Sequence, residues 1–140
     1  MTDHPGPESI DAVVDGSNAA WEERSGDGEP RVGNLTAIID ALKEEGIEPL
    51  VVVDASLRHQ VDDAEALERM LDDQVVRQAP AETQADTFIL DLADEFDALV
   101  VSNDTFEAHA DRYPWIGERR VPFMIVHNRV VLHLPDSDRE

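Results

Sequence analysis

The 140-residue sequence contains no cysteine. Disulfide bonds, thiolate nucleophiles and cysteine-ligated zinc are therefore excluded. The N-terminal residues contain no basic stretch followed by an apolar run, so we expect no signal peptide. No apolar run approaches the roughly 20 residues that a membrane span needs. We therefore expect a soluble, cytoplasmic protein with no membrane partner.

Basic residues are scarce, since 11 Lys and Arg stand against 32 Asp and Glu, for a formal net charge of -21. Lys43 is the only lysine. The acidic residues are spread along the chain, whereas an acidic tail for a basic partner would form one block. A halophilic surface fits better, because in molar salt the Debye length is only about 3 Å and self-repulsion is screened. In such salt, net charge says little about ligands.

Aromatic residues are also few, at 5%, but hydrophobic residues reach 41%, which predicts one domain with an aliphatic core. We expect a disordered leader at 1–9, a folded domain at 10–134 and a C-terminal tail at 135–140. Apolar runs predict strands at 10–15, 49–53, 75–76 and 98–101, and a strand pair within 121–134. Helical spacing predicts helices near 35–47, 63–73, 84–95 and 105–112, with Asn34 as a helix N-cap. This alternation predicts a mainly parallel sheet with helices on both faces.

Three predicted strands end in an aspartate: Asp15, Asp54 and Asp104. A single aspartate there is often a turn residue or a helix cap. Three of them at the carboxyl edge of one sheet would converge, and like charges raise each other's pKa. A divalent cation removes that cost, and Mg²⁺ or Mn²⁺ prefers such oxygen ligands together with phosphate. The pattern thus favours metal-dependent phosphate chemistry.

Other phosphate-binding folds lack their required residues here. The sequence contains no P-loop and no glycine-rich dinucleotide motif. A phosphoacceptor signalling domain would use Asp54 but needs a lysine after its last strand, whereas Lys43 lies in the first predicted helix. A haloacid-dehalogenase phosphatase needs a second aspartate two residues after Asp15, where Ser17 stands.

Two motifs, VVDGSN at 13–18 and VVSNDTF at 100–106, resemble the NYN branch of PIN-like nucleases, and most of all the Regnase ribonuclease domain. The segments SLR at 56–58 and ADTF at 85–88 are similar to further motifs of that family, and so is the stretch 115–126. The resemblance covers residues 10–132. It implies an α/β fold, namely a PIN-like (Rossmannoid) three-layer sandwich with a C-terminal strand pair.

The resemblance also implies a site and an activity. Asp15, Asp86 and Asp104 would hold Mg²⁺ or Mn²⁺, and water would cleave single-stranded or looped RNA in line, leaving a 5′-phosphate. For Asp86, at a helix start, a simple cap remains the alternative. The motifs suggest supporting roles in the site for Ser17, Asn18, Asn103, Thr105 and Asp54. RNA contacts are expected from Arg58 and Trp21, unless Arg58 forms a surface salt bridge and Trp21 is a packing residue.

Three departures from the family pattern bear on the activity. Ala85 stands where the family has the first of two adjacent acids, and Ala108 stands where another acid often follows. Asp54 or Asp91 could compensate for them. The family's zinc finger is missing, because the chain has no cysteine. A non-catalytic RNA-binding or assembly module on the same fold is therefore the alternative function, and a homodimer is left open.

Overall fold

Short apolar runs form the strands of this chain, in a computed structural model that describes residues 10–22, 28–80 and 83–134. The expected leader at 1–9 and the tail at 135–140 lie outside these residues. Five parallel strands form one sheet in the order β3-β2-β1-β4-β5. They are β1 (Ala12–Asp15), β2 (Pro49–Val53), β3 (Val76–Gln78), β4 (Leu99–Val101) and β5 (Arg120–Val121). An antiparallel pair, β6 (Phe123–Val126) and β7 (Arg129–Leu132), follows at the end of the described chain.

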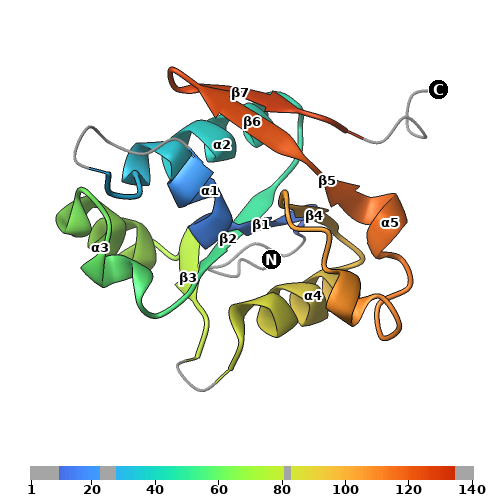
Figure 1. Ribbon diagram of the computed structural model, residues 1–140. Coiled ribbons are helices and arrows are strands. Elements are labelled where there is room, and N and C mark those ends of the chain that lie inside the picture. The colour runs from blue at the N-terminus through green and yellow to red at the C-terminus, as the bar shows by residue number, and fades with distance from the viewer. Residues whose placement is uncertain (1–9, 23–27, 81–82, 135–140) are drawn as a thin grey trace, which may run out of the picture.

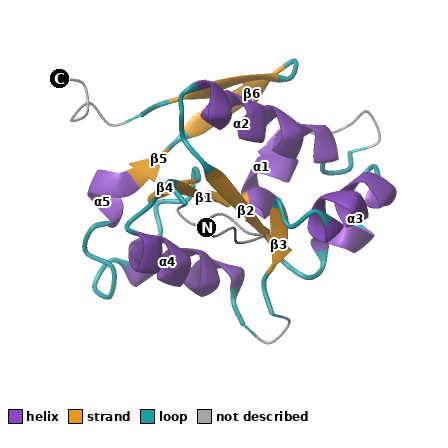
Figure 2. Ribbon diagram, turned by 180° about the vertical axis from the view of Figure 1, so that it is seen from behind, coloured by secondary structure: helices purple, strands orange, loops and turns teal. Residues whose placement is uncertain are grey.

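Helices connect the strands and cover both faces of the sheet. The described residues form α1 (Gly16–Glu22), α2 (Val32–Glu44), α3 (Ala64–Asp72), α4 (Ala85–Phe96) and α5 (Ile116–Arg119), with 3₁₀ turns at Leu57–His59 and Glu107–His109. In Figure 1, α1 and α2 lie on one side of the sheet and α4 lies on the other, and the view from behind in Figure 2 agrees. This arrangement confirms the predicted α/β sandwich.

The core is divided in two by the sheet, because successive strand residues point to opposite faces. Val14 belongs to the apolar cluster that contains Leu35 of α2. Its neighbour Val13 belongs to the cluster that contains Ile89 of α4. Both valines are fully buried. A strand buried on both faces reads as a continuous apolar run, which is how β1 and β2 appear in the sequence.

The β6–β7 hairpin, which is the strand pair predicted within 121–134, turns at His127 and Asn128. Both residues have positive φ, 52° and 65°, which is the geometry of a two-residue turn matched to the twist of antiparallel strands. The Asn128 side chain accepts a hydrogen bond of 2.7 Å from Arg31 Nη2. The turn is thereby tied to the residue that precedes α2.

Two details of the predicted secondary structure are wrong. No helix spans 105–112, because Phe106 adopts a left-handed conformation with φ 56° and only the 3₁₀ turn Glu107–His109 follows. Asn34 is not the N-cap of α2, because the helix already begins at Val32. Its side chain is instead buried and donates to the backbone carbonyls of Ala19 and Ala20. No helix among the described residues is long and apolar enough to cross a membrane.

Gly16 begins α1 directly after β1, and close packing requires a glycine there. A Cβ at Gly16 would lie 2.7 Å from Cγ1 of Val51 and of Val53, and 2.8 Å from the carbonyl oxygen of Val52. The valines can rotate, but the carbonyl belongs to a buried central strand. We expect Gly16→Ala to lower the free energy of unfolding by about 1 to 3 kcal/mol through overpacking.

Denaturant unfolding in molar KCl would measure this loss. Gly117→Ala is the matched control, because a Cβ there would meet nothing within 4 Å. Equal stability of the two variants would contradict the packing role of Gly16.

Candidate active site

Asp15 ends β1 at the carboxyl edge of the sheet, with 7% of its surface exposed. The register pairs Val14 with Val101, so Asp15 and Ser102 emerge side by side. The Ser102 hydroxyl donates a hydrogen bond of 2.8 Å to Asp15 Oδ2. The backbone N–H of Asn18 donates a longer bond of 3.4 Å to Oδ1. Asp15 is thus a buried carboxylate that two neighbouring groups orient.

Burial raises the pKa of Asp15 from 3.8 to about 6. The hydrogen bonds from Ser102 and Asn18 oppose this rise, and the negative charges of Asp86 and Asp104 add to it. Asp86 and Asp104, the two other proposed metal ligands, therefore lie close enough to Asp15 to raise its pKa. A cation that binds beside this carboxylate would stabilise its charged form.

Asp86 belongs to the first turn of α4, the helix on the opposite face of the sheet from α2 (Figure 1). Burial raises the pKa of this half-buried carboxyl, and the negative charge of Asp104 raises it further. The charge of His109 lowers it. Asp86 and Asp104 are therefore electrostatic neighbours, although 18 positions separate them in the chain.

Asp104 lies in the loop that follows β4, and hydrogen bonds hold this loop. Its backbone N–H donates to Ser102 Oγ at 3.0 Å, and its Oδ1 accepts from the Phe106 backbone N–H at 2.9 Å. Phe106 is 2% exposed, so its ring anchors the loop in the core. Ser102 thus connects Asp15 to Asp104 through one hydroxyl. Sequence reasoning missed Ser102 and Phe106, although both belong to the VVSNDTF motif.

The polar residues expected to support the site mainly fasten its loops to one another. Ser17 Oγ accepts from the backbone N–H of Asp54 at 3.0 Å. Asn18 Oδ1 accepts from the backbone N–H of Asn103 at 3.1 Å. The Asn103 side chain accepts from the N–H and donates to the carbonyl of Phe123, both at 2.9 Å. These bonds join the ends of β1, β2 and β4 and the start of β6.

The remaining acidic candidates have other neighbours. Asp54 follows β2 at the same edge of the sheet, but its Oδ1 accepts from the Ser56 hydroxyl at 2.9 Å, and its charge is not among those that shift the Asp15 pKa. Asp91 accepts a hydrogen bond of 2.5 Å from the Tyr113 hydroxyl. Burial and this bond raise the pKa of Tyr113. Neither carboxylate is among the charges that shift the pKa of Asp15.

The residues expected to contact RNA are placed as follows. Arg58 forms an ion pair with Glu68, at 2.6 Å from Nη2 to Oε2. Trp21, near the end of α1, is 40% exposed. Thr105, which was expected to support the site and not to contact RNA, is exposed beside Asp104.

The side chains of the site have the chemistry that a divalent cation prefers, but they are not already arranged around one. Within the described residues, no three Asp, Glu or His side chains stand as a finished metal cage. However, Asp15, Asp86 and Asp104 act on one another as negative charges, and the pKa values of Asp15 and Asp86 are raised. All three offer the oxygen ligands that Mg²⁺ and Mn²⁺ prefer.

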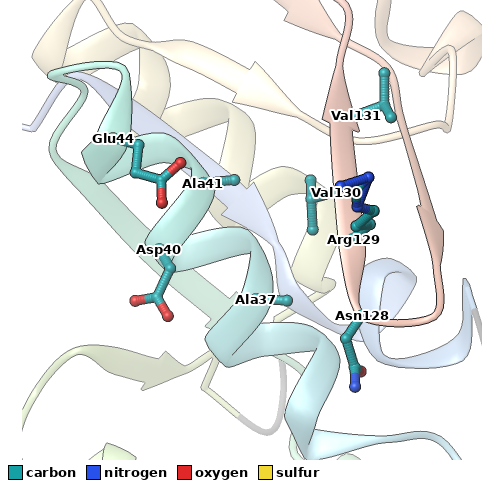
Figure 3. A pocket seen from close by; sticks show the side chains of 8 residues that line it. All are labelled: Ala37, Asp40, Ala41, Glu44, Asn128, Arg129, Val130 and Val131. Carbon is teal, nitrogen blue, oxygen red and sulfur yellow. The ribbon is translucent and has the colours of Figure 1, made fainter.

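A hollow of about 420 Å³ between α2 and β7 is separate from these aspartates (Figure 3). Asp40 and Glu44 line it from α2, and Arg129 lines it from β7. Ala37 and Ala41 point toward the strand, whereas Asp40 points away from it. None of Asp15, Asp86 and Asp104 lines this hollow.

Comparisons with known proteins place this geometry in a family. The family of the Zc3h12a-like ribonuclease NYN domain matches residues 9–140. The chain is similar in structure to nuclear proteinaceous RNase P 2 (PRORP2) of A. thaliana, with TM-score 0.74 and 21% identity over 91% of this chain and 30% of that chain. Another Arabidopsis thaliana PRORP2 structure gives TM-score 0.73 and 21% identity with the same coverage. At this identity the likeness shows the fold alone, and this chain spans less than a third of those chains. No curated protein matches.

Proposed function

Because the chain belongs to the family of Zc3h12a-like ribonuclease NYN domains, we propose that it is a metal-dependent endoribonuclease acting on single-stranded or looped RNA. The family match confirms the resemblance inferred from the motifs, and the chain has the fold of RNA-cleaving nucleases. The carrying observation is that the Ser102 hydroxyl bonds to both Asp15 and the backbone of Asp104 at the carboxyl edge of the sheet, where the charge of Asp86 also acts on Asp15. We propose these three as catalytic residues and as the ligands of Mg²⁺ or Mn²⁺.

The chain's own residues would prepare the site for in-line hydrolysis. Ser102 holds the carboxylate of Asp15 and the backbone of Asp104 in a fixed relation. Asp86 belongs to the first turn of α4, and its negative charge raises the pKa of Asp15. When bound, the metal would lower the pKa of a water and neutralise charge on the scissile phosphate. Ser17, Asn18, Asn103 and Thr105 would support the loops, and Asp54 lies next to them.

RNA would lie across α1 and the turn after β2 in this proposal. Trp21 offers an exposed ring on which a base can stack, and Arg58 could exchange Glu68 for a phosphate. We expect Trp21→Ala to weaken binding of a short single-stranded RNA by roughly 5- to 100-fold, since one stacked base contributes about 1 to 3 kcal/mol. Trp21→Phe should retain most of the affinity. Fluorescence anisotropy would measure both, and equal affinities of wild type and Trp21→Ala would assign the ring to packing.

A non-catalytic RNA-binding or assembly module is the second candidate. Ala85 favours it, because the family has an acid at this place. So does the lack of a finished three-ligand cage within the described residues. Such a module would bind RNA equally well when metal is removed.

RNA cleavage with and without metal separates the two candidates. In molar KCl with Mn²⁺, we expect the protein to cut a labelled single-stranded RNA and to leave 5′-phosphate ends. EDTA should stop the reaction, and excess Mn²⁺ should restore it. Binding without cleavage at any ratio of protein to RNA would favour the module, and cleavage that EDTA leaves unchanged would contradict the metal mechanism.

We also propose that the protein works in a cytoplasm of molar salt. The net charge of -21 destabilises the folded chain through self-repulsion, which salt screens. We therefore expect the thermal midpoint of unfolding to rise steeply from millimolar to molar KCl. Scanning calorimetry at several KCl concentrations would measure the rise. A midpoint independent of salt would contradict this interpretation.

A further inference from the structure

Exposed large apolar side chains are concentrated on the β6–β7 hairpin. Among the described residues, the large apolar side chains that stand exposed are Trp21, Met124, Val126 and Val131. The last three are 55%, 50% and 58% exposed, and all belong to the hairpin. A cluster of exposed apolar side chains on an otherwise polar surface is typical of an interaction site.

The strand register places these side chains on one face, here called the outer face and defined by Met124, Val126, Arg129 and Val131. Met124 pairs with Val131, and Val126 pairs with Arg129. The alternate residues point inward to the core, where Phe123 and Ile125 are buried. A shallow hollow of about 350 Å³ opens at the base of the outer face, lined by Pro122, Phe123, Met124, Val131 and His133.

The hairpin also lies in the part of the sequence that carries no negative charge. Residues 119–135 contain no Asp or Glu, which is the longest such stretch in a chain with 32 of them. Its charged residues are arginines, of which Arg129 stands on the outer face. Carboxylates return beyond β7, where Asp40 and Glu44 of α2 line the neighbouring hollow (Figure 3). The four side chains of the outer face therefore include no carboxylate, and Asp40 and Glu44 border the face beside Arg129 and Val131.

We propose that the outer face is the surface on which two copies of this chain associate, by a two-fold arrangement of their β6–β7 hairpins. Two copies that approach through acidic surfaces bring many carboxylates together, whereas the four side chains of the outer face include none. A two-fold contact uses the same patch on both copies, so each apolar face supplies the partner that the other needs. The side chains around Met124 and Val131 would enter each other's shallow hollow.

Size and chemistry specify the kind of association. A stable interface buries about 800 Å² on each partner, whereas the outer face is defined by only four side chains. The dimer is therefore weak and reversible, and molar salt favours it by screening the remaining charge. RNA is the less suitable occupant, because the face has aliphatic side chains where single-stranded RNA prefers aromatic rings.

Analytical ultracentrifugation of the full chain in molar KCl, from micromolar to millimolar protein, tests the proposal. We expect a monomer–dimer equilibrium in the wild type. Val131→Asp and Met124→Glu each place a carboxylate on the outer face and should weaken dimerisation by about tenfold or more. Ala64→Asp is the matched control, because it adds the same charge at the exposed first position of α3, where a helix N-terminus accepts an acid.

Two results would overturn the proposal. One is a wild type that stays monomeric at every protein concentration. This result would overturn the proposal even if the hairpin variants lost RNA binding. The other is dimerisation of Val131→Asp and Met124→Glu as tight as that of Ala64→Asp. Thermal unfolding of each variant would show that it is folded. Nuclease activity is not the readout, so failure of the proposed function would leave this test intact.

Discussion

Replacing Asp15 by asparagine is expected to abolish RNA cleavage and, at the same time, to stabilise the metal-free protein at neutral pH. The loss of activity should be about 100-fold or more, because the substitution removes a charged ligand from the proposed site. The gain in stability has a separate cause. A buried carboxylate with two like-charged neighbours is a cost to the folded state when no cation is present.

The pH dependence of this effect follows from the direction of the pKa shift. Folding raises the pKa of Asp15 from 3.8 to about 6, so the folded state binds this proton more tightly than the unfolded state. The stability due to Asp15 is therefore fully present below its unfolded pKa and is lost as the pH rises through about 6. At neutral pH the loss is about 3 kcal/mol, which Asp15→Asn should largely recover.

Denaturant unfolding in EDTA at several pH values would measure both effects. The difference between wild type and Asp15→Asn should be small at acidic pH and grow toward neutral pH. A variant that is less stable than the wild type at neutral pH would contradict the strained-carboxylate account, even if its activity is lost.

The two aspartates that follow β2 and β4, the strands on either side of β1, are expected to respond very differently to the same substitution. Asp104→Asn should lower the rate of RNA cleavage by about 100-fold or more, because its charge acts on both Asp15 and Asp86. Asp54→Asn should change the rate far less, because the Asp54 carboxylate is bonded to Ser56 and does not act on Asp15.

Single-turnover cleavage with saturating Mn²⁺ would compare the two variants. The Asp54 variant controls for the loss of one negative charge near the site. If Asp54→Asn lowers the cleavage rate more than Asp104→Asn does, Asp54 and not Asp104 belongs to the active site.

Strand ends explain why much of the site could be predicted from the sequence. Parallel strands place their carboxyl ends at one edge, so Asp15 and Asp104 were expected together once the apolar runs before them were recognised. Asp86 could be inferred only by resemblance, since an acid in the first turn of a helix is favourable anywhere.

Other features depend on contacts that a single sequence does not reveal. The role of Ser102 follows from the register of β1 against β4, which pairs Val14 with Val101. Neither α1 nor α5 is long enough for a helical period to appear, and β5 has only two residues. The left-handed backbone of Phe106 ended a helix that the residue pattern had favoured.

The most direct measurement of the central claim is a Mn²⁺ titration followed by electron paramagnetic resonance, in molar KCl to suppress binding to the acidic surface. We expect the wild type to take up Mn²⁺ at a specific site. Asp15→Asn, Asp86→Asn and Asp104→Asn should each weaken this binding strongly, and Asp54→Asn should retain it. Equal uptake of Mn²⁺ by the wild type and the first three variants would contradict the account, because Asp15, Asp86 and Asp104 would then not form the metal site.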